Sequence, residues 1–193
     1  TELFHGRNFF GVKRVLHSAD GNLNFFFHGR VIHGVEDRKP GNSCAPLAYF
    51  HRTGPVGDLF ETDAWRVTNR IAVVGLGVGA VSCYSQPEEE LTFYEIDPMV
   101  ETIARDPRLF SFVKNAPGTV RVVLGDGRKQ LEAAEDGSYA LIMLDAFSSD
   151  AVPTHLLTKE ALALYLQKLA PGGVLMFNIT NSYVDLLPLL ASL

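Results

Sequence analysis

Short runs of residues that favour β-strands fill the first part of the chain. The runs cover residues 9–16, 22–28 and 31–35, and glycine-containing turns at residues 20–22 and 28–30 separate them. Short runs bounded by such turns are typical of β-hairpins. A charged, turn-rich segment follows at residues 36–42. We therefore predict a small β-rich N-terminal domain over residues 1–62.

From residue 70 onward, apolar strands alternate with helices. The apolar runs cover residues 71–74, 91–96, 120–124, 139–144 and 174–179. Asp97 followed by Pro98 is typical of a helix start. A second helix is predicted over residues 160–169, with its leucines on one face: Leu162, Leu166 and Leu169. Alternating buried strands and helices predict an α/β, Rossmann-like, doubly wound and mostly parallel sheet over residues 63–193.

Composition adds limits to this picture. The chain has 193 residues, 47% of them apolar, and a net charge of −5 from 17 Lys and Arg against 22 Asp and Glu. These values exclude collagen-like and disordered classes. The mild acidity argues against nucleic-acid binding and suits a cationic substrate. The longest charge-free stretch, residues 71–87, contains three glycines and a proline, so we expect no membrane contact by this segment.

The cysteines and the ends of the chain lead to two further expectations. Cys44 and Cys83 are far apart in sequence and form neither a disulfide framework nor a metal-ligand spacing. We therefore expect a reducing compartment and a cytoplasmic location. The chain begins with Thr1 and ends in an apolar run, so we expect a piece of a longer protein, truncated at its C-terminus.

Polar residues and glycines follow the predicted strands, where ligands bind in this architecture. Gly75, Gly77 and Gly79 form a turn that lets the backbone approach a ligand, and a helix is expected to follow. Glu95 closes the next strand twenty residues later. A carboxylate at that point can accept both hydroxyls of a ribose. Asp97 is better explained as a helix N-cap.

The third and fourth strands also end in acids. Asp126 lies between Gly125 and Gly127, where a carboxylate can accept a hydrogen bond from the exocyclic amine of adenine, although a simple turn is an equal alternative. Asp145 directly follows a strand and is placed to hold or deprotonate a substrate amine. An NAD-dependent enzyme explains the glycine turn as well, but it gives Asp126 and Asp145 no role.

These motifs together resemble the spermidine/spermine synthase family of aminopropyltransferases, which has the fold of class I S-adenosylmethionine-dependent methyltransferases. Residues 71–79 resemble the nucleoside loop of the family, residues 94–97 its ribose motif and residues 125–127 its adenine motif. Residues 144–148 resemble the segment that carries its catalytic aspartate. The β-rich start resembles its small N-terminal domain.

The resemblance implies transfer of an aminopropyl group from decarboxylated S-adenosylmethionine to a small amine such as putrescine. It places the adenine at Asp126 and Gly127, the ribose at Glu95 and the sulfonium near Gly75 and Gly77. Asp145 would accept or orient the amine proton, and no metal and no tightly bound cofactor are implied. The alternatives are an S-adenosylmethionine-dependent methyltransferase of the same fold and a noncatalytic nucleoside-binding homologue.

The sequence departs from the family pattern at the acceptor side. Ser148 stands where the family has a second aspartate, and the next acid is Asp150. Residues 28–33 replace an acidic turn with histidines and Arg30, which suits a less cationic acceptor. Tyr49 is the nearest match to a tyrosine that the family has in an acidic segment of its N-terminal domain, and we include it among the catalytic candidates.

Two features of the N-terminal domain have more than one interpretation. His28 and His33 could bind a metal, but no Cys or carboxylate joins them at a ligand spacing, so scattered strand histidines are the better explanation. Phe25, Phe26 and Phe27 favour core packing or a subunit interface, and we expect a homodimer through this domain.

In the second domain, Asn178 and Asn181 follow the fifth predicted strand and could reach the cleft, although capping of the loop is the simpler explanation.

Overall fold

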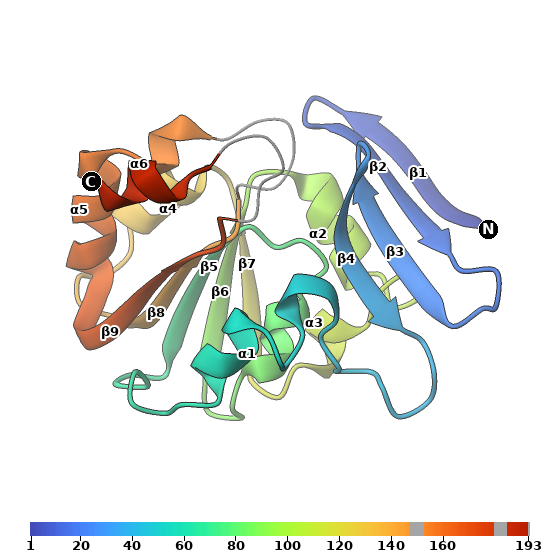
Figure 1. Ribbon diagram of the computed structural model, residues 1–193, viewed down its shortest axis with the longest axis horizontal. Coiled ribbons are helices and arrows are strands. Elements are labelled where there is room, and N and C mark those ends of the chain that lie inside the picture. The colour runs from blue at the N-terminus through green and yellow to red at the C-terminus, as the bar shows by residue number, and fades with distance from the viewer. Residues whose placement is uncertain (147–152, 180–184, 193) are drawn as a thin grey trace.

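Two sheets lie side by side along the molecule in the computed structural model, which describes residues 1–146, 153–179 and 185–192 (Figure 1). The first is a four-stranded antiparallel meander in the order β1-β2-β3-β4. Its strands are β1 (Glu2–Asn8), β2 (Gly11–His17), β3 (Leu23–His28) and β4 (Val31–Asp37). The predicted hairpins are confirmed, but β1 was missed, because its alternating polar residues are half-exposed or exposed.

The second sheet is entirely parallel and has the order β7-β6-β5-β8-β9. Its strands are β5 (Arg70–Val74), β6 (Glu90–Glu95), β7 (Thr119–Leu124), β8 (Tyr139–Leu144) and β9 (Leu169–Phe177). The strand order reverses between β5 and β8, which is where such sheets bind ligands. The predicted doubly wound fold is confirmed. β9 begins five residues before its expected start because it continues through Pro171-Gly172-Gly173.

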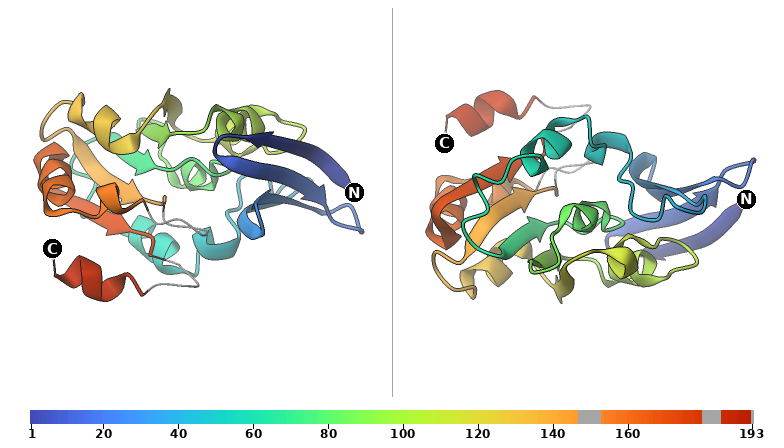
Figure 2. Two further views of the ribbon diagram at one scale, coloured as in Figure 1. Left: turned by 90° about the horizontal axis from the view of Figure 1, so that it is seen from above. Right: turned by 90° about the horizontal axis from the view of Figure 1, so that it is seen from below.

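Helices cover both faces of the parallel sheet, as the two views in Figure 2 show. One face packs on α1 (Pro55–Phe60), α2 (Pro98–Arg105) and α3 (Phe112–Asn115), and the other packs on α4 (Gly127–Glu132) and α5 (Lys159–Lys168). The remaining helical segments are η1 (Ala48–Phe50), η2 (Ala80–Tyr84), η3 (Thr154–Leu156) and α6 (Leu187–Ala191). Within the described ranges, no helix is long and apolar enough to cross a bilayer.

Two expectations about helices were wrong in part. The segment after the glycine turn is only the 3-10 helix η2, because Ala80–Tyr84 is wholly buried and leads straight into the next loop. In α5 the buried face is formed by Ala161, Tyr165 and Lys168, while Leu166 is exposed. The predicted start of α2 is confirmed, since the Asp97 side chain accepts a hydrogen bond from the backbone N–H of Met99 at 2.8 Å.

The antiparallel sheet shares a hydrophobic core with one face of the parallel sheet. Val15 and Phe26 from the small sheet belong to the same buried cluster as Phe93 of β6. Gly34 of β4 lies so close to Val78 that an added Cβ would be 2.4 Å from the Val78 Cγ2 atom. The small sheet is therefore packed directly on the glycine turn. The predicted domain boundary between residues 62 and 63 lies just after α1 and stays a prediction.

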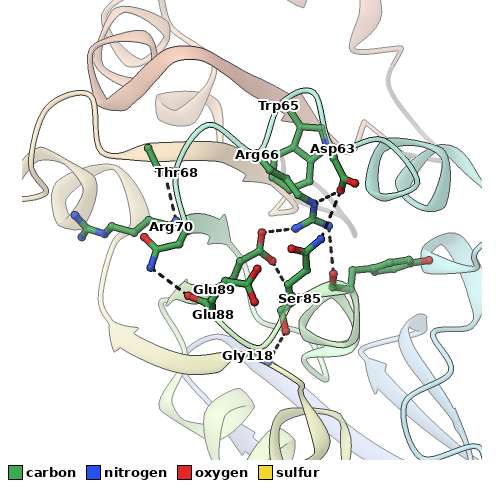
Figure 3. A network of polar contacts seen from close by, with 12 residues as sticks. Asp63, Trp65, Arg66, Thr68, Arg70, Ser85, Glu88, Glu89 and Gly118 are labelled. Atoms are coloured by element: carbon green, nitrogen blue, oxygen red, sulfur yellow. Dashed lines mark hydrogen bonds and ion pairs between the residues drawn. The ribbon is translucent and has the colours of Figure 1, made fainter.

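A polar network fixes the opposite end of the parallel sheet, where β6 begins (Figure 3). The buried Arg66 guanidinium forms an ion pair with Glu89 and lies 3.0 Å from an Asp63 carboxylate oxygen. The backbone of Glu89 accepts a hydrogen bond from the N–H of Thr119 at the start of β7. Breaking a buried ion pair on one side only is costly. This network therefore stabilises the starts of β6 and β7, which lie at the end of the sheet opposite the ligand-binding end.

Cys44 and Cys83 form a disulfide, with their Cα atoms 5.4 Å apart. The expectation that they stay unpaired was therefore wrong. Cys44 lies in the loop after β4 and Cys83 in η2. Their separation of 39 residues in sequence gives no sign of contact, and only the packing of the small sheet on the glycine turn brings them together. The bond ties the loop that leads to Tyr49 to the segment after Gly79.

Candidate active site

A cavity of about 360 Å³ lies at the carboxyl ends of the parallel strands, between the two sheets. One side is formed by glycines and acids that follow strands β5, β6, β7 and β8, and the other by aromatic and imidazole side chains of the small sheet and η1. Most of the predicted site residues line it: Tyr49, Gly75, Gly77, Glu95, Asp126, Gly127 and Asp145. Gly79 does not line the cavity, because it packs against Val113 instead.

The glycine turn needs its glycines for close packing as well as for conformation. Gly75 has φ of 101°, and an added Cβ would lie 2.6 Å from the carbonyl oxygen of Asp145. Gly77 has φ of 53°, and its Cβ would lie 3.3 Å from the carbonyl oxygen of His33. Positive φ values favour glycine. The turn thus passes between the end of β8 and the small sheet.

Glu95 is buried at the end of β6 and holds the glycine turn. One carboxylate oxygen accepts a hydrogen bond from the backbone N–H of Leu76 at 2.9 Å, and the other accepts one from the N–H of Asp97 at 2.8 Å. Burial raises the pKa of Glu95, and these two hydrogen bonds oppose the rise. Each oxygen keeps a second lone pair, so the carboxylate can still accept two ribose hydroxyls.

Asp97 links the ribose motif to the small sheet. Besides capping α2, one of its oxygens accepts a hydrogen bond from the Asn8 side chain at 2.6 Å, and the other forms an ion pair with Lys13. The Lys13 side chain is completely buried. The interpretation of Asp97 as an N-cap is confirmed, but Lys13 was not foreseen, because in sequence it resembles any polar residue of a strand.

Asp126 caps α4 and also faces a histidine. Its side chain accepts a hydrogen bond from the backbone N–H of Lys129 at 3.0 Å, and His155 Nε2 lies 2.8 Å from its other oxygen. Burial raises the pKa of Asp126, but these two partners outweigh that effect and leave it below its usual value. Asp126 is therefore a charged acceptor at the cavity edge. His155 was not foreseen, because 29 residues separate the two.

Asp145 lies at the end of β8, where its carboxylate faces the cavity. The Asn178 side chain donates a hydrogen bond to it at 2.6 Å. The surrounding protein raises the pKa of Asp145 to about 7, the Asn178 hydrogen bond opposes the rise, and the charge of Glu95 adds to it. Asn178 thus contacts Asp145, although it is not one of the residues that line the cavity. A carboxylate with a pKa near neutrality can exchange protons with a substrate at physiological pH.

The N-terminal part of the chain supplies the opposite wall. Phe10, Phe26, His28 and His33 line the cavity together with Tyr49 of η1. Burial raises the pKa of Tyr49 well above its usual value, and the charge of Asp145 adds to this, so the two side chains face the same space. Phe10 and Phe26 were not among the predicted site residues, because aromatic side chains of a sheet are more often core.

His28 and His33 are neighbours in space, so describing them as scattered was wrong. Their ring centroids are 5.5 Å apart. A β-bulge brings them together: Phe26 pairs with Gly34 and Phe27 with Ile32, which leaves His33 as the extra residue of β4. Such bulges re-aim side chains. Among the residues that the structure describes, no three His, Cys, Asp or Glu side chains are arranged to hold a metal ion.

Some predicted features cannot be placed. Ser148 and Asp150, where the sequence departs from the family pattern, lie outside the described residues, as does Asn181.

The fold and the cavity define a class of protein. A parallel sheet that reverses its order at β5 and β8, with a glycine turn and three acids at consecutive strand ends, is a Rossmann-like architecture.

Known proteins of this class are similar to the chain. A polyamine aminopropyltransferase of Vibrio vulnificus (strain CMCP6) is 39% identical over 114 residues, which cover 56% of this chain and 37% of that protein. The structure of a probable spermidine synthase from Corynebacterium glutamicum superposes with a TM-score of 0.72 at 19% identity, covering 89% of this chain and 62% of that one. Spermidine synthase from Thermotoga maritima gives 0.68 at 14%, covering 98% and 60%.

These similarities have different weights. The two structures establish the fold, and the Vibrio protein adds a sequence relationship over its matched region. No family model matches the chain. The chain is therefore similar in sequence to a polyamine aminopropyltransferase and in fold to spermidine synthases, which agrees with the resemblance found in its motifs. The matched region spans little more than a third of the Vibrio relative.

Proposed function

We propose that the protein transfers an aminopropyl group from decarboxylated S-adenosylmethionine to an amine. The observation that carries the proposal is Asp145, a carboxylate with a pKa of about 7 that faces the same cavity as Glu95 and the glycine turn. The nucleoside part of this site suits a methyltransferase as well, so the choice between the two reactions rests on the relatives. The relative from Vibrio vulnificus is named a polyamine aminopropyltransferase, which supports the choice.

The proposed roles follow the order of the strand ends. Glu95 accepts hydrogen bonds from the ribose hydroxyls, Asp126 and Gly127 lie at the adenine edge, and the backbone of Gly75 and Gly77 borders the sulfonium. No metal and no tightly bound cofactor take part. Gly79 acts indirectly, by holding the turn against Val113.

Asp145 prepares the acceptor amine in the proposed reaction. It accepts a proton from the ammonium form, because only the neutral amine has a lone pair for attack. The amine nitrogen then forms a bond to the propyl carbon next to sulfur, the carbon–sulfur bond breaks, and its electron pair stays on the sulfur of methylthioadenosine. Tyr49, which faces Asp145 across the cavity, orients the amine.

Product analysis with decarboxylated S-adenosylmethionine and an amine tests this function. We expect Asp145→Asn to lower kcat/KM by about 10²- to 10⁴-fold, the usual contribution of a general base, while methylthioadenosine still binds. Asp58→Asn, which changes an exposed acid of α1, serves as the matched control and keeps full activity. Full activity of Asp145→Asn contradicts the role of Asp145. Methyl transfer from S-adenosylmethionine supports the methyltransferase, and tight nucleoside binding without any product supports the noncatalytic homologue.

Two further proposals concern partners and location. We propose a homodimer through the small sheet, because Phe25 and Phe27 alternate with buried Phe26 along β3 and Phe27 pairs with Ile32, which is 41% exposed. A patch of this kind favours association, and analytical sedimentation measures the oligomeric state.

The cytoplasmic location remains a proposal from the sequence. The Cys44–Cys83 disulfide argues against it, because disulfides persist mainly in oxidising compartments.

A further inference from the structure

The cavity has two chemically different halves, and this difference bears on the acceptor. The half beside the parallel sheet contains every carboxylate that lines the cavity among the described residues: Glu95, Asp97, Asp126 and Asp145. The half beside the small sheet contains Phe10, Phe26, His28, His33 and Tyr49. The proposed nucleoside occupies the acidic half, so the acceptor extends from Asp145 into the aromatic half.

Three of the four carboxylates are already engaged. Asp97 is paired with Lys13 and Asp126 with His155, while the oxygens of Glu95 accept two backbone N–H groups and are assigned to the ribose hydroxyls for their remaining lone pairs. Within the described ranges, the one hydrogen-bond donor to the Asp145 carboxylate is the Asn178 amide, which leaves room for one ammonium.

Among the residues that the structure describes, the aromatic half offers no negative charge to a second ammonium. His28 Nε2 is 2.6 Å from the carbonyl oxygen of Phe10 and thus already has a partner. Burial, the neighbouring His28 and the positive charge of Lys13 lower the pKa of His33 to about 4, so its imidazole is neutral at pH 7. The ammonium of Lys13 already lies over the Phe10 ring, 5.9 Å from its centroid, and a second cation there would be repelled.

We infer that the acceptor is a monoamine with an apolar or aromatic body, held by Asp145 at its amine and by the aromatic wall along its body. This inference rests on the proposed function. Burying a second ammonium without a partner is unfavourable, whereas an alkyl chain or ring gains contact with Phe10 and Phe26. The bulge at His33 is the structural feature that turns a neutral ring toward this half of the cavity.

Pentylamine and putrescine provide a direct test, because they differ only by a methyl group in place of the second amine. Calorimetry is carried out on the protein saturated with methylthioadenosine. We expect pentylamine, and phenethylamine likewise, to bind at least tenfold more tightly than putrescine. Equal or tighter binding of putrescine overturns the inference, and so does absence of binding by all three amines.

A pair of variants locates the preference. His33→Asp adds a carboxylate to the aromatic wall and is expected to shift the preference at least tenfold toward putrescine, and His28→Asp provides the same test at a half-buried position if the first variant does not fold. His5→Asp, on the exposed side of β1, leaves the preference unchanged. If putrescine binds best and is aminopropylated, the inference fails and the proposed function stands; if methylthioadenosine does not bind, the proposed function itself fails.

Discussion

At the scale of single residues, the site depends on how the protein sets the proton affinity of Asp145. Burial and the charge of Glu95 raise its pKa, while the hydrogen bond from Asn178 lowers it by stabilising the charged form. The balance leaves the pKa at about 7. Asp145 is therefore protonated below neutrality and becomes a base above it, so we expect kcat/KM to rise as the pH passes from 6 to 8.

Removal of the Asn178 hydrogen bond tests this balance. In Asn178→Ala the carboxylate loses the partner that favours its charged form, so the rise of kcat/KM moves to higher pH. A hydrogen bond to a charged group contributes about 1.5–3 kcal/mol, and we expect a loss of roughly tenfold or more at pH 7 with a smaller loss at pH 9. A pH profile of kcat/KM measures the shift.

The control for this profile is Asn42→Ala, which removes an asparagine that is bonded to Asp37 outside the cavity. Its profile is expected to overlay that of the unchanged protein. An Asn178→Ala profile with the same midpoint and a uniform loss at every pH contradicts the proposed link to Asp145.

At the scale of elements, the β1–β2 hairpin holds the turn between β6 and α2. Asn8 and Lys13 both contact Asp97, and the backbone N–H of Asp97 donates a hydrogen bond to Glu95. The small sheet thereby fixes the ribose motif. Lys13 acts through Asp97 and does not itself contact the proposed ribose position. This arrangement makes Lys13 a positioning residue.

Lys13→Met tests the hairpin contact. It leaves the buried Asp97 without its cation, and breaking a buried pair on one side typically costs about 3–5 kcal/mol. We expect a loss of that size in the free energy of unfolding, measured in urea, and weaker binding of methylthioadenosine because the turn that carries Glu95 loosens.

The double variant Lys13→Met with Asp97→Asn provides the matched comparison. It removes the uncompensated charge and is expected to recover part of the lost stability. If the two single changes simply add in the double variant, the Lys13–Asp97 pair is not the cause of the loss.

The strand ends were predictable from the sequence because each apolar run of the parallel sheet is continuous and stops at a polar residue or a glycine. Gly75, Glu95, Asp126 and Asp145 were found in this way. The contacts of Lys13 with Asp97 and of Asn178 with Asp145 were not, since 33 residues separate the latter pair and far more the former. Such pairs depend on how whole elements pack, which local patterns do not record.

At the scale of the whole molecule, the described residues of the two sheets pack together as one unit. The small sheet contributes to the core of the parallel sheet, supplies one wall of the cavity and is tied to η2 by the Cys44–Cys83 disulfide. The predicted division at residues 62 and 63 thus follows the change of strand pattern. The cavity, however, is formed by both parts together.

Reduction of the disulfide tests how much this covalent tie stabilises the molecule. Closing a loop between residues 39 apart restricts the unfolded chain by roughly 4 kcal/mol in the chain-entropy model, and measured values are usually about 2–4 kcal/mol. We expect dithiothreitol to lower the free energy of unfolding in urea by an amount in that range. Cys44→Ala, which removes the half-buried partner, is the control: its stability is already lower and dithiothreitol leaves it unchanged. If the unchanged protein is equally stable with and without reductant, the disulfide does not stabilise the molecule. The small sheet would then be held by its apolar contacts alone.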